Sequence, residues 1–480
     1  MGGLIAYAAY IPYNRLKRGE IAAVLQAGGG RGTRSVASYD ENTTSMGVEA
    51  ARMALRGLPG ALSMPQRIYF ATAAPAYLDK TNAATIQAAL DMSDAVLAVD
   101  MAGAVRSGVG ALLAAQDAAV PTMAVLSDVR FGLPGGADER DGGDGAAAFV
   151  FGGNTAAPVI AEVIAHASTT AEFLDRWRLP SDPTSRVWEE RFGEHVYGPL
   201  AVAAFGSALQ QSGLTPERVD HLIVTGVHAR AARQFTATCG VSAKAVADDF
   251  SATLGNTGTA HAGIMLADLL DRAAPDRIIA MVVLADGASV LILRTTKAVA
   301  EHRGNTPVAA QIVAGNDGLS YATFLSWRGL LDREPPRRPD PQPPSAPPAY
   351  RREDWKFAFV ASRCEACGTR HLPPDRVCVR CHAVDQMTRE RLADVPATIA
   401  TFTVDRLAYT PSPPLIAAVI DFDGGGRFRC QLTDVNPAEV AIGGRVEMTF
   451  RKVVTADGIH NYFWKARPIR QAAAPGGGLT

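Results

Sequence analysis

The amino-acid sequence predicts an α/β domain built from two related halves, followed by smaller domains that are rich in turns and short strands. Three observations carry this prediction. Strand-like apolar runs alternate with helical patterns over residues 1–300, the triplet Asp-Gly-Ala precedes a buried strand at both 144–146 and 286–288, and a proline-rich stretch at 335–348 precedes two C-x-x-C pairs. At 480 residues, the chain has room for two or three domains.

The elements of the first half follow from the spacing of its apolar residues. Runs with strand character cover 4–11, 21–25, 67–72, 95–99 and 122–126, and helical spacing covers 45–55, 83–90 and 105–115. A glycine-rich turn at 142–145 then leads into a fully apolar strand that ends at Gly152. This alternation of strands and helices predicts an α/β architecture.

The second half repeats the pattern of the first. We expect helices at 200–212 and 263–272, and strands at 221–224, 277–284 and 289–293. Because both halves end with Asp-Gly-Ala and a buried strand, the sequence predicts an internal duplication about a pseudo-two-fold axis.

Residues 335–348 mark a domain boundary. They read P-P-R-R-P-D-P-Q-P-P-S-A-P-P, which favours an extended spacer because proline cannot pair in a sheet or continue a helix. Beyond the spacer, short strands are expected at 396–405, 415–422, 427–433, 445–453 and 460–465, which predict a small barrel of the OB type. We therefore divide the chain into domains at 1–300, 355–390 and 391–470, with a connecting segment at 301–354.

Four cysteines follow the spacer in two pairs, Cys364 with Cys367 and Cys378 with Cys381. Each C-x-x-C turn aims two thiolates at one ion, so the two turns together complete the tetrahedral shell of a zinc ion. The alternative is a pair of disulfides or a redox dithiol, which a chain without a secretory signal does not favour. The sequence predicts a zinc ribbon, whose filled shell stabilises the fold and performs no chemistry.

The charge balance excludes several classes of partner. Lys and Arg number 47 against 48 Asp and Glu, so the formal net charge of −1 offers no footprint for nucleic acid or an anionic membrane. The apolar stretch at 2–12 is too short to span a bilayer and lacks the basic start of a signal peptide. We expect a cytoplasmic protein in which Cys239 and Cys430 remain unpaired.

Two parts of the chain resemble known families. Residues 1–300 resemble the 3-hydroxy-3-methylglutaryl-CoA synthase and ketoacyl synthase III branch of the thiolase superfamily, through S-Y-D-E-N-T-T-S-M-G-V-E-A-A (38–51), G-G-D-G-A-A-A-F (142–149), V-T-G-V-H (224–228) and G-N-T-G-T-A (255–260). Residues 355–470 resemble the DUF35 family, a rubredoxin-like zinc ribbon followed by an OB fold, through the cysteine pairs and G-G-R-F-R-C-Q-L-T-D (425–434). The first resemblance implies a thiolase-like five-layered αβαβα fold, normally dimeric, that acts on coenzyme A thioesters by Claisen-type chemistry.

The resemblance also assigns positions to the site. In this branch a Cys at the start of a buried helix is acylated, a His and an Asn polarise the thioester carbonyl, and synthases add a Glu as general base. His228 and Asn256 match the His and Asn positions. Val105 falls at the Cys position and Ala73 at the Glu position, with Asp79 as a weak substitute for the Glu.

A valine at the Cys position makes the ordinary acyl-enzyme route impossible, because its side chain has no lone pair and no ionisable proton. Ser107 and Cys239 are the nearby alternatives, and neither falls at the expected place. His228 and Asn256 also have purely structural interpretations, as a loop cap and a turn residue. We expect His261 on the surface of a helix.

Three functions are consistent with these residues. The leading hypothesis is a subunit of an acyl-CoA carbon–carbon bond forming or cleaving complex, whose OB domain binds acyl-CoA or bridges to a separate thiolase, since DUF35 proteins typically accompany thiolases and synthases. The alternatives are a Cys-independent aldolase or retro-Claisen enzyme that uses His228, and a non-catalytic scaffold.

Four arginines beside the ribbon cysteines either offset thiolate charge, meet CoA phosphates or are simply solvated: Arg363, Arg370, Arg376 and Arg380.

Overall fold

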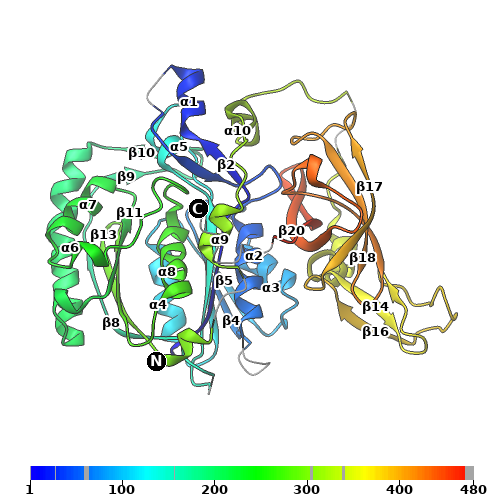
Figure 1. Ribbon diagram of the computed structural model, residues 1–480, viewed down its shortest axis with the longest axis horizontal. Coiled ribbons are helices and arrows are strands. Elements are labelled where there is room, and N and C mark those ends of the chain that lie inside the picture. Colours follow the sequence, from blue (N-terminus) through cyan, green and yellow to red (C-terminus); the bar gives the residue numbers. More distant parts are fainter. Residues whose placement is uncertain are drawn as a thin grey trace, which may run out of the picture. The chain divides into compact units, whose positions relative to one another are not determined.

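The computed structural model describes residues 2–26, 29–58, 64–155, 157–302, 306–337 and 341–470 (Figure 1). Contacts divide the chain into two compact units. The N-terminal unit comprises residues 1–37, 42–84 and 95–321, and the C-terminal unit comprises residues 38–41, 85–94 and 322–480. Two short segments from early in the sequence therefore belong to the C-terminal unit.

The N-terminal unit is built on a nine-stranded sheet with the strand order β11-β12-β13-β8-β1-β7-β6-β4-β5. Its strands are β1 (Leu4–Tyr10), β4 (Arg67–Thr72), β5 (Leu97–Ala102), β6 (Thr122–Asp128), β7 (Gly145–Phe151), β8 (Ala161–Thr170), β11 (His221–Gly226), β12 (Ile278–Leu284) and β13 (Gly287–Thr295). Two further pairs lie outside this sheet, β2 (Asn14–Lys17) with β3 (Thr33–Val36) and β9 (Arg176–Trp177) with β10 (Arg186–Val187).

The strand pairings confirm the predicted duplication. In the first half, β4 is parallel to β6, β6 is antiparallel to β7, and β7 is antiparallel to β1. In the second half, β11 is parallel to β12, β12 is antiparallel to β13, and β13 is antiparallel to β8. The two Asp-Gly-Ala turns lead into the equivalent strands β7 and β13, and the halves adjoin where Leu4 pairs with Ala161.

Helices complete the five-layered αβαβα arrangement that the family resemblance implies. Helices α4 (Ser107–Gln116) and α8 (His261–Arg272) share one buried core with strands of both halves, and Figure 1 shows them in the interior of the unit. Helix α2 (Thr43–Arg56) packs on β1, β6 and β7, whereas α6 (Glu190–Ser212) and α7 (Ala229–Thr238) cover the second half through a separate core.

The other α-helices in the described residues are short. They are α1 (Arg18–Leu25), α3 (Asn82–Ala89), α5 (Ala137–Asp141), α9 (Val308–Val313), α10 (Tyr321–Trp327) and α11 (Ala346–Arg351). The strand predicted at 21–25 is wrong, because these residues form the second part of α1. Only Ile21 of this apolar run is buried, while Val24 and Leu25 are exposed, so one face of a helix satisfies the pattern.

The C-terminal unit contains the predicted ribbon and barrel. The ribbon sheet has the order β15-β14-β16, from β14 (Val360–Cys364), β15 (Arg370–His371) and β16 (Met387–Arg391). The five-stranded barrel sheet has the order β19-β18-β17-β20-β21, from β17 (Ala397–Asp405), β18 (Leu415–Phe422), β19 (Arg427–Gln431), β20 (Arg445–Ala456) and β21 (Ile459–Pro468). Five antiparallel strands confirm the predicted number.

The predicted spacer at 335–348 is partly helical. Residues 338–340 lie outside the described residues, but α11 begins at Ala346 with prolines in its first turn. Proline is tolerated there because the first N–H groups of a helix have no intrahelical partner. The expectation of an extended segment is therefore wrong for its last three residues.

A cluster of buried charges stabilises the C-terminal unit. Arg451 is fully buried, and its guanidinium lies 2.7 Å from the Glu41 carboxylate and 2.5 Å from that of Asp434. Lys465 Nζ donates to Asp40 Oδ2 at 2.9 Å. Burial by itself would raise the pKa of Asp40, but the charges of Lys465 and Arg451 lower it below its usual range. The carboxylates of the segment 38–41 thus neutralise cations of the barrel.

Among the helices that the structure describes, none combines the length and the apolar character needed to cross a membrane.

Candidate functional site

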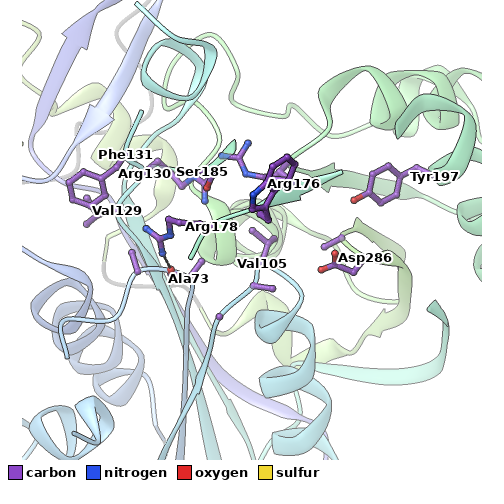
Figure 2. A pocket seen from close by; sticks show the side chains of 16 residues that line it. Ala73, Val105, Val129, Arg130, Phe131, Arg176, Arg178, Ser185, Tyr197 and Asp286 are labelled. Atoms are coloured by element: carbon purple, nitrogen blue, oxygen red, sulfur yellow. Dashed lines mark hydrogen bonds between the residues drawn. The ribbon is translucent and has the colours of Figure 1, made fainter. Parts of the chain in front are cut away.

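The candidate site is a cavity of about 110 Å³ in the N-terminal unit (Figure 2). It lies beside the turn that leads from β5 into α4 and is closed by residues of the second half. Its lining comprises Ala73, Ala74, Gly103, Ala104, Val105, Val129, Arg130, Phe131, Arg176, Trp177, Arg178, Ser185, Tyr197, Val227, Ala285 and Asp286. The cavity is smaller than the roughly 300–1,000 Å³ typical of pockets for drug-sized ligands, so it suits a short group.

Val105 occupies the turn just before α4 and lines the cavity. The residue after it, Arg106, holds this turn against the second half, because its guanidinium donates to the carbonyl oxygens of Asp286 at 2.6 Å and Thr169 at 3.1 Å. The start of the interior helix therefore presents a hydrocarbon side chain to the cavity, as Figure 2 shows.

Ala73 also lines the cavity, directly after strand β4. Its backbone N–H donates to Asp128 Oδ1 at 2.8 Å, and its carbonyl accepts a hydrogen bond from Arg178. Asp79, the weak substitute for a general base, is exposed and is not among the residues that line the cavity. The wall at Ala73 therefore offers a methyl group and a carbonyl that is already bonded.

The hairpin of β9 and β10 supplies one wall of the cavity. Arg176 and Trp177 pair with Val187 and Arg186, which brings Arg176, Trp177, Arg178 and Ser185 onto the lining. Arg176 forms an ion pair with Asp138, whereas Arg178 donates a hydrogen bond to the neutral carbonyl of Ala73.

Asp286 and Tyr197 line the cavity from the second half. In Figure 2 they lie on one side of Val105, with Ala73 and Arg178 on the other. Asp286 has a left-handed backbone with φ of 46°, which lets the chain turn tightly between β12 and β13. Burial and the carboxylates of Asp175 and Asp286 raise the pKa of Tyr197, so its hydroxyl remains protonated.

His228 lies behind this wall. It is 7% exposed and caps α7, because its Nδ1 accepts the N–H of Ala231 at 3.1 Å. The proton of the neutral ring is therefore on Nε2. Val227 lines the cavity, whereas His228 is not among its lining residues and instead packs on Tyr197 with ring centroids 5.9 Å apart.

A buried carboxyl lies close to the His228 ring. A β carbon placed on Gly193 would lie 2.6 Å from His228 Nε2 and 2.9 Å from Asp175 Oδ1, so Gly193 leaves room for both groups. Asp175 is 4% exposed, and its Oδ1 accepts no hydrogen bond from the part of the chain that the structure describes. Burial raises the pKa of Asp175, and the nearby His228 opposes that shift.

Asn256 has a structural task. Its Nδ2 donates to the Gly226 carbonyl at 2.7 Å, and its Oδ1 accepts the N–H of Gly258 at 2.9 Å. The side chain thus fixes the end of β11, two residues before His228, and it is not among the lining residues. A shared catalytic use of His228 and Asn256 stays a prediction.

His261 is buried, contrary to the expectation of a helix surface. It begins α8 at 3% exposure, and its two ring nitrogens lie 3.2 Å from the Thr257 N–H and 3.0 Å from the Asp249 carbonyl oxygen. Burial lowers the pKa of His261 to about 4. The sequence pattern did not show this because the interior helix is covered on all sides by the two half-sheets.

Replacing His261 is expected to change the pH dependence of stability. Because its folded pKa lies below its unfolded value, the neutral ring contributes fully above about pH 6.5, and this contribution is lost as the pH falls toward 4. At pH 5 the loss should be about 2 kcal/mol in the free energy of unfolding. Urea unfolding at pH 7 and pH 5 measures it, and an equal loss in the His261→Gln variant would contradict this assignment.

The alternative nucleophiles do not lie at the cavity wall. Ser107 is the first residue of α4, and Cys239 ends α7 with its thiol 3.5 Å from the Thr236 carbonyl oxygen. Neither is among the lining residues. None of the cavity-lining residues carries a thiol, and all six cysteines of the chain are free of disulfides.

The ribbon cysteines form a candidate metal centre. Their four sulfur atoms lie within 4.8 Å of one another, with 3.5 Å between Cys364 and Cys381 and 3.5 Å between Cys367 and Cys378. Tetrahedral zinc with Zn–S bonds of about 2.3 Å needs sulfurs roughly 3.8 Å apart, so the arrangement fits the ion. Four thiolates hold it as a structural metal.

Both cysteine turns have the same local structure. The N–H of Gly368 donates to the Cys364 carbonyl at 2.8 Å, and the N–H of His382 donates to the Cys378 carbonyl at 2.9 Å. Gly368 and His382 both have positive φ, at 74° and 61°, which allows each turn to close around an ion.

Three of the four arginines beside the ribbon have carboxylate partners. Arg370 forms two hydrogen bonds to Glu390, at 2.9 and 2.6 Å, and Arg376 forms two to Asp385, at 2.6 and 2.7 Å. Arg363 lies 3.9 Å from Glu390. These partners indicate that Arg370 and Arg376 are structural, rather than open to a phosphate.

Sequence reasoning missed most of the cavity wall. Arg130, Arg176, Arg178, Tyr197 and Asp286 come from four places in the chain that only the fold brings together. The segment R-W-R at 176–178 was the one local signal, because two guanidiniums flanking an indole bring cationic and aromatic groups together.

Fold and sites together define a protein with a thiolase-like fold, a zinc ribbon and an OB-fold domain. Residues 357–385 match the model of the rubredoxin-like zinc ribbon domain of ChsH2, and residues 390–451 match that of the C-terminal OB-fold domain of ChsH2. The hydroxymethylglutaryl-CoA synthase of Methanothermobacter thermautotrophicus is 26% identical over 346 residues, which span 69% of this chain and 99% of that relative. The corresponding synthase of Pyrobaculum neutrophilum is 27% identical over 348 residues, spanning 68% and 97%.

Solved structures show the same fold. The 3-oxoacyl-[acyl-carrier-protein] synthase III of Aquifex aeolicus superposes with a TM-score of 0.52 at 20% identity, covering 61% of this chain and all of that one. MvaS in complex with 3-hydroxy-3-methylglutaryl coenzyme A superposes with a TM-score of 0.56 at 18% identity, covering 71% of this chain and 94% of that one. These similarities confirm the thiolase-like fold.

Proposed function

We propose that this protein acts on coenzyme A thioesters as a subunit of a complex that forms or cleaves carbon–carbon bonds, without an acyl-enzyme intermediate of its own. One observation carries the proposal. The turn into the interior helix α4 presents Val105 to the cavity, where this fold class uses a cysteine, and the wall opposite presents Ala73. Neither side chain attacks a thioester or moves a proton.

The substrate class rests on similarity. The relatives are named hydroxymethylglutaryl-CoA synthases, and one solved structure of this fold is an HMG-CoA synthase complexed with CoA. The small cavity beside Val105 suits the acyl part of such a thioester, and the longer CoA portion would extend out of it.

The C-terminal unit would connect this chain to its partner. Because the ribbon metal has a full thiolate shell, it performs no chemistry, so we assign the ribbon and barrel to binding. The OB domain would bind acyl-CoA or bridge to a catalytically complete thiolase, and the N-terminal unit would form a homodimer. The protein would thus hold a substrate or product of its partner's reaction.

A second function is favoured by the buried pair beside the cavity. His228 and Asp175 lie behind Tyr197, and aldol cleavage of a β-hydroxyacyl thioester needs a base but no acyl-enzyme. His228 Nδ1 would have to release the N–H of Ala231 to accept the hydroxyl proton, while the Asp175 carboxylate would hold the proton on Nε2. The protein would then be a Cys-independent aldolase or retro-Claisen enzyme that acts on CoA thioesters through His228.

Turnover of a panel of acyl-CoAs, measured with and without a thiolase copurified from the native host, tests these functions. Activity only with the added thiolase supports the leading function. Activity of the isolated protein that is lost in His228→Ala supports the aldolase. Intact-mass detection of an acyl adduct on the isolated protein would overturn both, and failure to bind any CoA species would favour a scaffold.

A further inference from the structure

The cavity is strongly cationic on one wall. Arg130, Arg176 and Arg178 all line it, from the loop after β6 and from the β9–β10 hairpin. Asp286 is the one acidic residue of the lining, and in Figure 2 it lies with Tyr197, away from Arg130 and Arg178. Three guanidiniums on the wall of one small cavity attract an anion.

The arginines differ in how far their charges are compensated. Arg176 is paired with Asp138, and Arg178 donates to the Ala73 carbonyl. The Arg130 guanidinium forms no hydrogen bond or ion pair with any residue in the described ranges. Two cations at the cavity therefore lack a carboxylate partner. Arg130 is half-buried and Arg178 is exposed, so both can reach the charge of a bound anion.

Electrostatics support the proximity of these groups. Burial lowers the pKa of Arg130, and the positive charges of Arg176 and Arg178 lower it further, against the attraction of Asp128 and Asp138. Asp128 is already committed, since its carboxylate accepts hydrogen bonds from Thr72, Ala73 and Thr259. A bound anion would relieve the repulsion between the arginines.

The cavity lining also includes small apolar side chains. Val105, Ala104 and Ala285 have side chains that contain only hydrocarbon. A ligand with a short carbon chain and a terminal anionic group matches both surfaces, because its chain packs on the small side chains while its charge meets the guanidiniums.

We propose that the cavity binds the free carboxylate of a short dicarboxylic acyl group carried by coenzyme A, with Arg130 and Arg178 as its ligands. The inference rests on the proposed function and specifies its substrate class. Where a cysteine would hold the acyl group by a covalent bond, the guanidiniums hold it by charge and hydrogen bonds. Arg–carboxylate pairs are the strongest recognition elements available for such a group.

A second source of anion is the coenzyme A phosphates. The cavity's volume of about 110 Å³ and its place at the start of an interior helix favour the acyl carboxylate, because the phosphates belong to the larger and more polar end of the ligand. The experiment separates the two sources by including coenzyme A without an acyl group.

Calorimetric titration of the full chain compares two pairs of thioesters with the same shape, malonyl-CoA with isovaleryl-CoA and succinyl-CoA with 4-methylpentanoyl-CoA. We expect the charged member of at least one pair to bind about tenfold tighter or more. Arg130→Gln should weaken that member about tenfold to a hundredfold and leave the neutral member unchanged. Arg233→Gln, on the exposed face of α7, is the matched control and should change neither.

The outcomes distinguish the inference from the function on which it rests. Equal binding within both pairs by the wild-type protein overturns the carboxylate site but leaves the proposed function standing, and this comparison does not depend on any variant. Equal weakening of coenzyme A alone by Arg130→Gln assigns the cations to a phosphate and also overturns the carboxylate site. No binding of any thioester overturns the site and the function together.

Discussion

A Val105→Cys variant is expected to form a covalent acyl adduct that the wild-type protein does not form. The new thiol would stand in the turn before α4, where the unpaired N–H groups and the dipole of the helix lower a thiol pKa, and it would face the cavity. Its alkylation by iodoacetamide near pH 7 should be about tenfold faster than that of an ordinary exposed thiol. Intact mass after incubation with acetyl-CoA measures the adduct.

Ser107→Cys is the matched control for this experiment. Ser107 is the first residue of that helix, two residues after Val105, but is not among the residues that line the cavity. Its thiol would share the effect of the helix start but would not line the cavity, so we expect it to remain unacylated. If both thiols are acylated alike, or if neither gains reactivity over free cysteine, then Val105 does not occupy the nucleophile position.

Cys364→Ser is expected to release zinc and unfold the ribbon while the N-terminal unit keeps its structure. Cys364 is 1% exposed and contributes one of four sulfurs, so its loss leaves an open three-thiolate site. Structural zinc contributes about 10–16 kcal/mol of apparent binding free energy in small zinc domains, far more than a short three-stranded sheet supplies by packing. Zinc content and amide hydrogen exchange over β14 and β16 measure the effect.

The same exchange experiment provides the internal comparison. Protection of β7 in the core of the N-terminal unit should be unchanged, and Cys239→Ser, a partly buried cysteine outside the ribbon, should retain zinc. Full zinc occupancy in the Cys364→Ser protein would show that this cysteine is not a ligand. Loss of protection in β7 would show that the two units unfold as one.

The sequence predicted correctly those parts of the fold that are determined by residues close together in the chain. Strand β4 and strand β18 match their predicted bounds, because each is an apolar run closed by turn residues. The two Asp-Gly-Ala turns located the ends of both halves, since each leads into a buried strand. Strand β7 is buried at every position, and β13 is buried at every position except one. The spacing of the four cysteines predicted a tetrahedral metal site, because each C-x-x-C turn supplies two thiolates.

Other elements depend on the whole fold. Strand β8 was not predicted, because its sequence A-E-V-I-A-H-A-S-T-T mixes exposed and buried residues and becomes a strand by pairing with β13 along its length. Residues 21–25 formed a helix because only one of their faces meets a core. His261 was placed on a surface, although both half-sheets enclose its helix.

The site was predictable in its position but not in its chemistry. The resemblance located the turn at Val105 and the end of β11 near His228, which are both next to the cavity. It did not locate Arg130 or Arg178, because a hairpin between β8 and α6 and a loop after β6 converge only in three dimensions. Charged residues that are brought together only by the tertiary structure have no characteristic separation in the sequence.

The buried charges around Arg451 set a limit on how this gene can be divided. A fragment that starts at residue 322 would retain Arg451, Lys465 and Asp434 but lose Asp40 and Glu41, so two cations would remain with one anion in an apolar interior. Anyone transplanting the barrel to another protein must therefore supply a surrogate for that four-residue loop or replace the two cations with hydrocarbon of similar volume. The C-terminal region is a continuous stretch of DNA sequence, but it is not a self-sufficient folding module.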